Sequence, residues 1–266
     1  GSIFGQEKNV VNAAIAKMNL FLHGASDFNV MQGDTLRDPK ILQGGNIAKF
    51  DCVIANPPFS LENWGATEWS SDKYKRNIYG TPSDSCGDYA WIQHMICSMV
   101  SGQGRMAVVM PQGILFRNQE TEIRKQLVES DLIEAVVTLG DKLFYGTGLS
   151  PCFLIIRRMK PAHHSGRILM IDGSKILTQK RAQNILEEND IDRLYSLYQN
   201  YSDEEDYSRI VTLQEIRDKE YNLSPNRYVV YHKEEIRPYA EVLAEFKHAY
   251  EEVKRLEEEF SLLINA

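Results

Sequence analysis

The sequence has few cysteines, few glycines and prolines, no surplus of basic residues and no long apolar run. Its four cysteines form no Cys-x-x-Cys pair, which argues against structural zinc and against a disulfide-stapled scaffold. Seventeen glycines and nine prolines among 266 residues are too few for a low-complexity, wholly disordered chain. No apolar stretch approaches the roughly 18 residues that cross a membrane, and no signal peptide is recognisable. We therefore expect a cytoplasmic protein with no membrane partner.

The charge balance argues against a self-sufficient nucleic-acid binder. Thirty Lys and Arg residues against 37 Asp and Glu residues give a formal net charge of -7. A protein that binds nucleic acid by itself usually carries a basic surface, because it has to neutralise phosphates. If this chain acts on DNA or RNA, we expect a partner to supply much of the positive field.

Helical and apolar segments alternate along the first part of the chain. The expected helices span 7–22, 87–100 and 119–129, and the expected strands span 3–5, 28–31, 50–55, 106–110, 132–137, 152–156 and 167–171. This alternation is typical of an α/β fold with a mainly parallel, doubly wound sheet that is covered on both faces. Because ligands bind beyond the carboxyl ends of such strands, we expect the site near Glu7, Asp34, Asn56 and Gln112.

We expect three parts in the chain: the α/β region over 3–172, a helical and irregular continuation over 173–232, and a long helix over 233–266. Apolar residues of the last part alternate spacings of four and three, as in a heptad repeat. They are Val242, Phe246, Ala249, Val253, Leu256, Phe260 and Leu263. The stripe favours a coiled-coil or helix-groove partner over a helix that packs on its own domain.

The most informative segment is Asn56-Pro57-Pro58-Phe59, directly after an apolar strand. It can be a plain turn, because Asn before Pro often begins one and two prolines stop a strand. The alternative is that the segment binds an amino group on an aromatic ring. Such an amino group is a poor nucleophile, because its lone pair is delocalised into the ring. The Asn56 side-chain oxygen and the Pro57 carbonyl, held rigid by Pro58, can accept its two hydrogens while Phe59 stacks on the base. Positioning and electrostatics then favour attack on a methyl group.

This segment resembles the catalytic motif of amino-group methyltransferases that use S-adenosylmethionine, and N6-adenine DNA methyltransferases match best. Within that class the chain is similar to the modification subunit of type I restriction-modification systems. Further segments in the family's order are Phe4-Gly5-Gln6-Glu7, Ala16-Lys17-Met18-Asn19-Leu20, His23-Gly24, Gly33-Asp34-Thr35-Leu36, Val109-Met110-Pro111-Gln112-Gly113 and Gly146-Thr147-Gly148. The similarity runs from about Ile3 to Tyr228.

The resemblance implies a class I S-adenosylmethionine-dependent methyltransferase fold over 3–172, followed by a C-terminal helical extension. It implies that Asn56, Pro57 and Phe59 bind and activate a flipped adenine, with Pro58 shaping the turn. Glu7 would bind the ribose hydroxyls of S-adenosylmethionine, Asp34 its adenine amine, and Asn56 would adjoin the cofactor; no metal is implied.

Two of these residues have simpler explanations. Glu7 can be an acid favoured at a helix start, and Asp34 a turn former beside Gly33. Gln112 is a further candidate for lining the site. The implied partners are DNA, a specificity subunit, a second modification subunit and, in some systems, a restriction subunit.

One feature departs from the family. In the family a glycine-rich cofactor loop precedes the position equivalent to Glu7, whereas nothing of that kind precedes Ile3 in this sequence. We therefore expect an N-terminally truncated fragment that binds S-adenosylmethionine weakly or not at all and is inactive by itself.

The polar stretch over 61–85 is too long for an ordinary connection. Its aromatic residues and the cluster of Lys73, Lys75 and Arg76 suit contact with nucleic acid, whereas a disordered insertion is the alternative. Two other functions stay open for the chain. It could methylate RNA or a protein glutamine, although Tyr is the more familiar fourth motif residue there, or it could be a non-catalytic assembly module.

Overall fold

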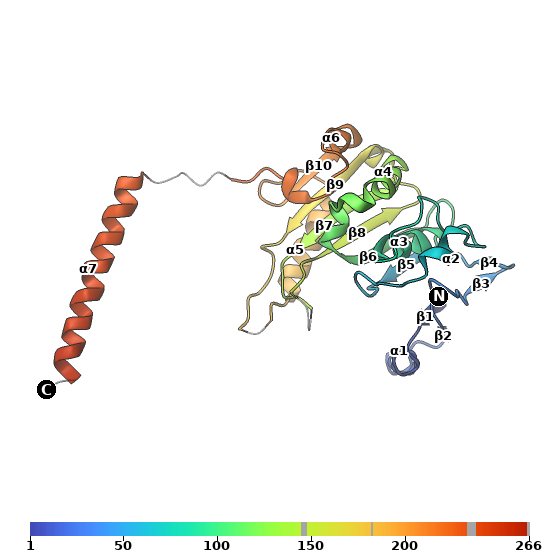
Figure 1. Ribbon diagram of the computed structural model, residues 1–266, viewed down its shortest axis with the longest axis horizontal. Coiled ribbons are helices and arrows are strands. Elements are labelled where there is room, and N and C mark those ends of the chain that lie inside the picture. Colours follow the sequence, from blue (N-terminus) through green and yellow to red (C-terminus); the bar gives the residue numbers. More distant parts are fainter. Residues whose placement is uncertain (145–147, 182, 233–237, 265–266) are drawn as a thin grey trace. The chain divides into compact units, whose positions relative to one another are not determined.

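The computed structural model describes residues 1–144, 148–181, 183–232 and 238–264. The chain divides into two compact units, residues 1–230 and residues 231–266. The first unit holds the α/β region, and the second holds one long helix (Figure 1). Gly146 and Thr147, which belong to one of the family-like segments, lie outside the described residues.

A six-stranded sheet forms the centre of the first unit. In sheet order its strands are β10 (Ser208–Thr212), β9 (Arg167–Gly173), β7 (Ile133–Leu139), β8 (Pro151–Arg157), β6 (Arg105–Pro111) and β5 (Cys52–Ala55). Strands β5, β6, β7 and β9 run in one direction, whereas β8 and β10 run in the other. The sheet is therefore mixed, with β8 inserted antiparallel between β6 and β7, and β5 lies at one edge.

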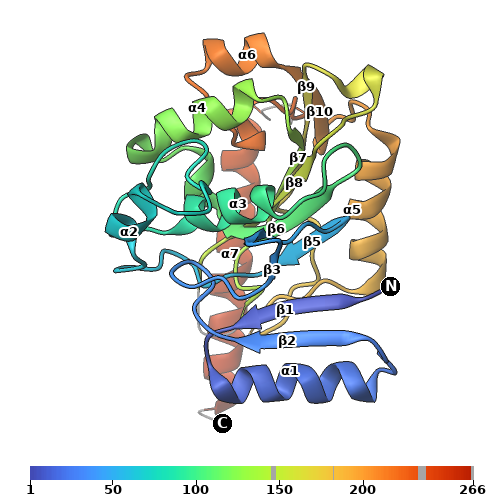
Figure 2. The same cartoon turned by 90° about the vertical axis from the view of Figure 1, so that its right-hand side faces the viewer.

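A smaller parallel sheet pairs β1 (Ile3–Glu7) with β2 (Phe28–Gln32). The two strands are joined by α1 (Val10–Leu22), which packs along them (Figure 2). The helix begins at Val10 because the Asn9 side chain accepts hydrogen bonds from the backbone N–H groups of Val11 and Asn12. A short hairpin of β3 (Leu42–Gln43) and β4 (Asn46–Ile47) follows.

Helices cover the six-stranded sheet on both faces (Figure 2). On one face α3 (Asp88–Cys97), α4 (Thr121–Glu129) and α6 (Leu213–Asp218) contribute to the larger core, and on the other α5 (Glu188–Asn200) contributes to the smaller one. Alternate residues of β6 point into the larger core: Met106, Val108 and Met110. Burying each such side chain contributes about 1.5–3 kcal/mol. Shorter helices are α2 (Ala66–Ser70), η1 (Gln112–Leu115), η2 (Asn118–Glu120), η3 (Ala162–His164) and η4 (Pro225–Arg227).

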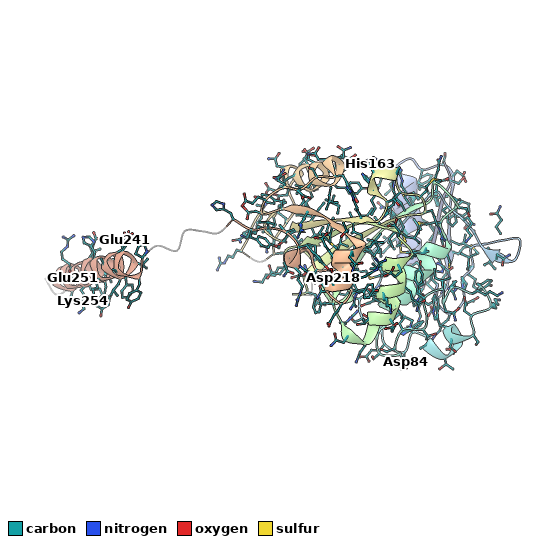
Figure 3. The ribbon with its side chains drawn as sticks, turned by 90° about the horizontal axis from the view of Figure 1, so that it is seen from above. Asp84, His163, Asp218, Glu241, Glu251 and Lys254 are labelled. Carbon is teal, nitrogen blue, oxygen red and sulfur yellow. The ribbon has the colours of Figure 1, made fainter. Side chains whose placement is uncertain are left out.

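The second unit contains α7 (Tyr239–Ile264), a helix where the heptad pattern predicts one. Its charged residues, including Glu241, Glu251 and Lys254, project from the helix (Figure 3). The expected apolar stripe is exposed at Val242, Phe246, Val253, Leu256 and Phe260. The side chain of Leu263 lies outside the described residues. Among the described helices, α7 included, none combines the length and the apolar character that crossing a bilayer requires.

Candidate active site

The motif Asn56-Pro57-Pro58-Phe59 follows the carboxyl end of β5, where the sequence predicts a ligand site. Val53 and Ala55 of β5 pack against the larger core, and this anchors the strand that carries the motif. Asn56 is exposed, Pro57 is buried and Phe59 is half-buried. Within the described residues the Asn56 side chain makes no hydrogen bond, so its amide oxygen is available to a ligand.

A second aromatic ring lies beside Phe59. The rings of Phe59 and Phe144 meet edge to face, with 6.3 Å between their centroids. Phe144 follows β7, whose carboxyl end points to the same edge of the sheet as that of β6. Sequence reasoning missed Phe144, although the rule that led to Asn56, a residue beyond the carboxyl end of an apolar strand, also applies to it.

Glu7 ends β1 and supports the start of α1. Its Oε1 atom accepts a hydrogen bond of 2.7 Å from the backbone N–H of Asn9. In the described part of the chain the other carboxylate oxygen has no hydrogen-bond partner, and the side chain is half-exposed. Glu7 therefore acts as an acid at a helix start, the simpler explanation considered from the sequence. Its other carboxylate oxygen stays available for a hydroxyl group.

Asp34 follows β2 and forms a turn. Its Oδ1 atom accepts hydrogen bonds from the backbone N–H groups of Leu36 and Arg37, and its Oδ2 atom lies 2.9 Å from Lys8 Nζ. Partial burial raises the pKa of Asp34, but the contacts with Lys8 and with the backbone outweigh burial and hold that pKa below its usual value. Asp34 is therefore an ionised acceptor near neutral pH.

Gln112 connects the ends of three strands. Its Nε2 atom donates to the carbonyls of Leu139, 2.9 Å away, and Pro151, 3.2 Å away. Both amide hydrogens are used inside the protein, so these contacts fit a structural role for Gln112.

The stretch over 61–85 is folded against the rest of the unit. Trp64 and Trp69 are both 2% exposed and pack edge to face in a small core with Leu36 and Ala90. The Trp64 indole donates to the Ser83 carbonyl over 2.8 Å. These contacts exclude the disordered insertion considered from the sequence.

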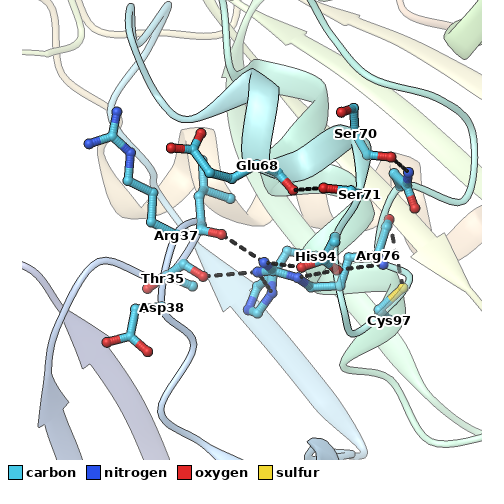
Figure 4. A network of polar contacts seen from close by, with 12 residues as sticks. Thr35, Arg37, Asp38, Glu68, Ser70, Ser71, Arg76, His94 and Cys97 are labelled. Atoms are coloured by element: carbon cyan, nitrogen blue, oxygen red, sulfur yellow. Dashed lines mark hydrogen bonds and ion pairs between the residues drawn. The ribbon is translucent and has the colours of Figure 1, made fainter.

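The expectation that Arg76 contacts nucleic acid together with Lys73 and Lys75 is wrong, because Arg76 is only 2% exposed. Its guanidinium pairs with Asp72 and donates to the carbonyls of Thr35 and Leu36 (Figure 4). It also stacks over the Trp69 ring. All of its donor groups are used inside the protein, so it is not placed to bind a phosphate. Lys73 and Lys75 are exposed.

Arg76 also connects two parts of the site. The carbonyls that it binds belong to the two residues directly after Asp34. The neighbouring Arg37 guanidinium donates to the Asn63 carbonyl in the segment that follows the motif. The structure thus brings the turn around Asp34 and the segment after Phe59 together.

Comparison with known proteins points to one family. Residues 1–236 match the family described as N-6 DNA Methylase. The type I restriction enzyme MjaVII methylase subunit of Methanocaldococcus jannaschii is 36% identical over 271 residues, covering 97% of this chain and 46% of that protein. The HindI methylase subunit of Haemophilus influenzae is 31% identical over 238 residues, covering 86% of this chain and 52% of that protein.

A solved structure gives the same result. The type I restriction-modification methyltransferase subunit of Streptococcus thermophilus superimposes with a TM-score of 0.78 at 29% identity, covering 86% of this chain and 48% of that one. This likeness confirms the expected fold class. The chain spans about half the length of the curated relatives it matches. With a family match over the whole of the first unit, this chain belongs to the N-6 DNA methylase family.

Proposed function

We propose that this chain is part of the modification subunit of a type I restriction-modification system and methylates adenine N6 in DNA. The observation that carries this proposal is the exposed Asn56 amide after the carboxyl end of β5, which makes no hydrogen bond among the described residues, together with the edge-to-face pair of Phe59 and Phe144. An adenine reaches such a site only when it is flipped out of the duplex. The curated relatives that support the proposal are methylase subunits of type I restriction enzymes.

The motif residues hold the target amine in this proposal. The Asn56 Oδ1 atom and the Pro57 carbonyl accept the two hydrogens of N6, which directs the nitrogen lone pair out of the ring plane. Phe59 stacks on the base, and Pro57 and Pro58 limit the backbone freedom of the loop. The rate gain comes from orientation and from fixed dipoles, with no covalent bond to the protein.

The donor chemistry of the described residues fits S-adenosylmethionine. Glu7 has a carboxylate oxygen available for ribose hydroxyls, and the ionised Asp34 can accept a hydrogen bond from an adenine amine. When bound, the cofactor supplies an electrophilic methyl group. Glu7 ends β1, and Asp34 and Asn56 follow the ends of β2 and β5, where ligands bind in α/β sheets.

Partners complete the proposed system in the cytoplasm. DNA and a specificity subunit are the principal ones, joined by a second modification subunit and, in some systems, a restriction subunit. A net charge of -7 supports the proposal that a partner supplies much of the positive surface that binds DNA. The exposed apolar stripe of α7 supports docking of a partner helix. Lys73 and Lys75 remain candidates for contact with the DNA backbone.

The test is Asn56→Ala in the complete modification enzyme, the full-length subunit with its specificity partner. We expect methyl transfer to DNA to fall by about 100-fold or more, because one acceptor for the target amine is lost. Asn12→Ala, at an exposed position of α1, is the matched control and should keep full activity. Methyl transfer to RNA or protein in place of DNA, or full activity of Asn56→Ala, would refute the proposal.

A further inference from the structure

The backbone directly after the motif is held by a buried carboxylate. Ser60 follows Phe59 and has a φ of 50°, which lies in the left-handed region that residues other than glycine rarely adopt. Its backbone N–H donates to Asp88 Oδ1 over 2.7 Å. Asp88 is 0% exposed and is the first residue of α3. A single hydrogen bond to a buried charge thus supports an unfavourable backbone conformation beside the catalytic motif.

The other oxygen of Asp88 is bound by an arginine from the next strand's loop. Arg117 follows β6 and η1, and its Nη2 atom donates to Asp88 Oδ2 over 2.6 Å. The same guanidinium donates through Nε to Glu120 Oε2 over 2.9 Å, and Glu120 is 4% exposed. Glu120 therefore fixes Arg117, which in turn fixes Asp88. This network connects the loop after β6 to the loop after β5.

Close packing holds the same segment from a second direction. The backbone N–H of Gly87 donates to the Leu61 carbonyl over 3.0 Å. A Cβ atom at Gly87 would lie 2.8 Å from Cγ of Trp64, closer than packed side chains allow. The start of α3 is therefore pressed against the chain that follows the motif, and Asp88 is the charged group at this contact.

Stability alone is a weak reason for such a network. Burying a carboxylate costs free energy that its ion pair recovers only in part, and apolar side chains often serve a core equally well. A buried charge pair does, however, restrict two loops to one relative position, because its hydrogen bonds are directional.

From this geometry we infer that Asp88 and Arg117 are positioning residues that fix the Asn56–Phe59 loop in the orientation needed to hold the flipped base. The inference rests on the proposed function, because it assigns these residues a task in base binding. Neither residue touches the substrate; Asp88 acts through the Ser60 backbone, and Arg117 acts through Asp88.

The experiment uses Asp88→Asn, Arg117→Ala and Arg117→Lys in the complete modification enzyme. The structural control is Lys160→Ala, because Lys160 forms a similarly half-buried ion pair with Asp131 over 2.5 Å and makes no contact with the loop after β5 among the described residues. Hydrogen–deuterium exchange of the peptide over 56–64 reports the loop directly. Single-turnover rates and 2-aminopurine fluorescence at the target position report its function.

We expect faster exchange over 56–64 in Asp88→Asn and Arg117→Ala but not in Lys160→Ala. The single-turnover rate should fall by about 100-fold, as expected for a small misplacement of reacting groups, while the KM for S-adenosylmethionine stays unchanged. The fluorescence of the flipped 2-aminopurine should change, because the base is no longer held against Phe59. Arg117→Lys should recover part of the rate, since it restores the positive charge without the fork of donors.

The inference is overturned by unchanged exchange over 56–64 in Asp88→Asn, or by an equal loss of rate in Lys160→Ala at the same loss of thermal stability. Asn56→Ala is measured in parallel to separate the two proposals. If Asn56→Ala is inactive while the Asp88 and Arg117 variants keep full activity, only the positioning role fails. If the wild-type enzyme does not methylate DNA, the proposed function fails, and the exchange measurement still decides whether this network holds the loop.

Discussion

The ring planes of Phe59 and Phe144 stand at 80° to each other, with 6.3 Å between the ring centroids. Phe59 belongs to the motif after β5, and Phe144 belongs to the connection after β7. Two aromatic side chains from the connections after separate strands thus lie together beyond the carboxyl ends of those strands. A planar base can contact both of them, one by its face and the other by an edge.

We expect Phe144→Ala to weaken binding of DNA that carries a flipped target base. Loss of one base-stacking contact costs about 1–3 kcal/mol, which corresponds to about a 5- to 150-fold weaker Kd. The measurement is a fluorescence titration with 2-aminopurine at the target position. Phe21→Ala, at an exposed position of α1, is the control. Equal affinity of Phe144→Ala and wild type would remove Phe144 from the site.

Arg76→Ala is expected to destabilise the first unit by about 3–5 kcal/mol. The change leaves Asp72, whose side chain is 6% exposed, as an unpaired carboxylate, and it removes the hydrogen bonds to the carbonyls of Thr35 and Leu36. Urea unfolding measures the loss. Arg37→Ala is the comparison, because Arg37 is exposed and donates to a single carbonyl. A smaller loss in Arg76→Ala than in Arg37→Ala would contradict the structural role.

Lys73→Ala with Lys75→Ala should act on DNA binding and not on folding. Both side chains are exposed, so their loss leaves no buried partner unsatisfied. If each contacts one phosphate, the slope of log K against log salt should decrease by about 1 per lysine. Binding of the complete enzyme is measured across a salt series, with Lys17→Ala on α1 as the control. An unchanged slope would show that these lysines do not contact DNA.

His94 should make stability depend on pH. Its Nδ1 atom lies 3.2 Å from Arg76 Nη1, and burial together with the charge of Arg76 lowers the pKa of His94 to about 3. In the unfolded chain the His pKa is about 6.5, so the unfolded state binds more protons between these values. Stability therefore falls as pH decreases from about 6.5 towards 3, by up to about 1.4 kcal/mol per pH unit.

The measurement is urea unfolding at several pH values between about 5 and 7.5. His94→Asn keeps an acceptor for Arg76 but cannot titrate, so we expect it to lose this part of the slope. The same slope in both proteins would mean that another group controls stability in this range.

A calorimetric titration tests the expectation about the cofactor. Glu7 and Asp34 are the cofactor residues that we propose in this chain. We expect Glu7→Gln and Asp34→Asn to weaken the binding of S-adenosylmethionine by the complete modification enzyme, because each change removes a charged acceptor from the proposed site. Unchanged affinity in both variants would mean that the cofactor site lies elsewhere.

Local patterns predicted the elements that carry the motif. The apolar run over 50–55 predicted β5, and the prolines after Asn56 predicted its end. The helical spacing over 7–22 predicted α1, although the helix begins at Val10 because Asn9, and not Glu7, caps it. These features depend on neighbours in the sequence, so the sequence alone is sufficient to find them.

Features that depend on distant residues were not predictable. The burial of Arg76 requires carbonyls from Thr35 and Leu36, and no spacing rule connects such positions. The bond between Asp88 and Arg117 joins two loops that follow different strands. Strand direction is a similar case, because an apolar run such as β8 predicts a strand without indicating that it lies antiparallel between β6 and β7.

The edge position of β5 affects how the isolated chain behaves in solution. Its sequence, Cys-Val-Ile-Ala, has no charge, proline or bulge of the kind that protects edge strands from pairing, and Ile54 is 77% exposed. Such an edge can template the addition of a strand from another molecule. Concentrated solutions of this chain should therefore aggregate through β5. The exposed thiol of Cys52 offers a direct reporter, because labelling by a maleimide will slow as that edge becomes covered.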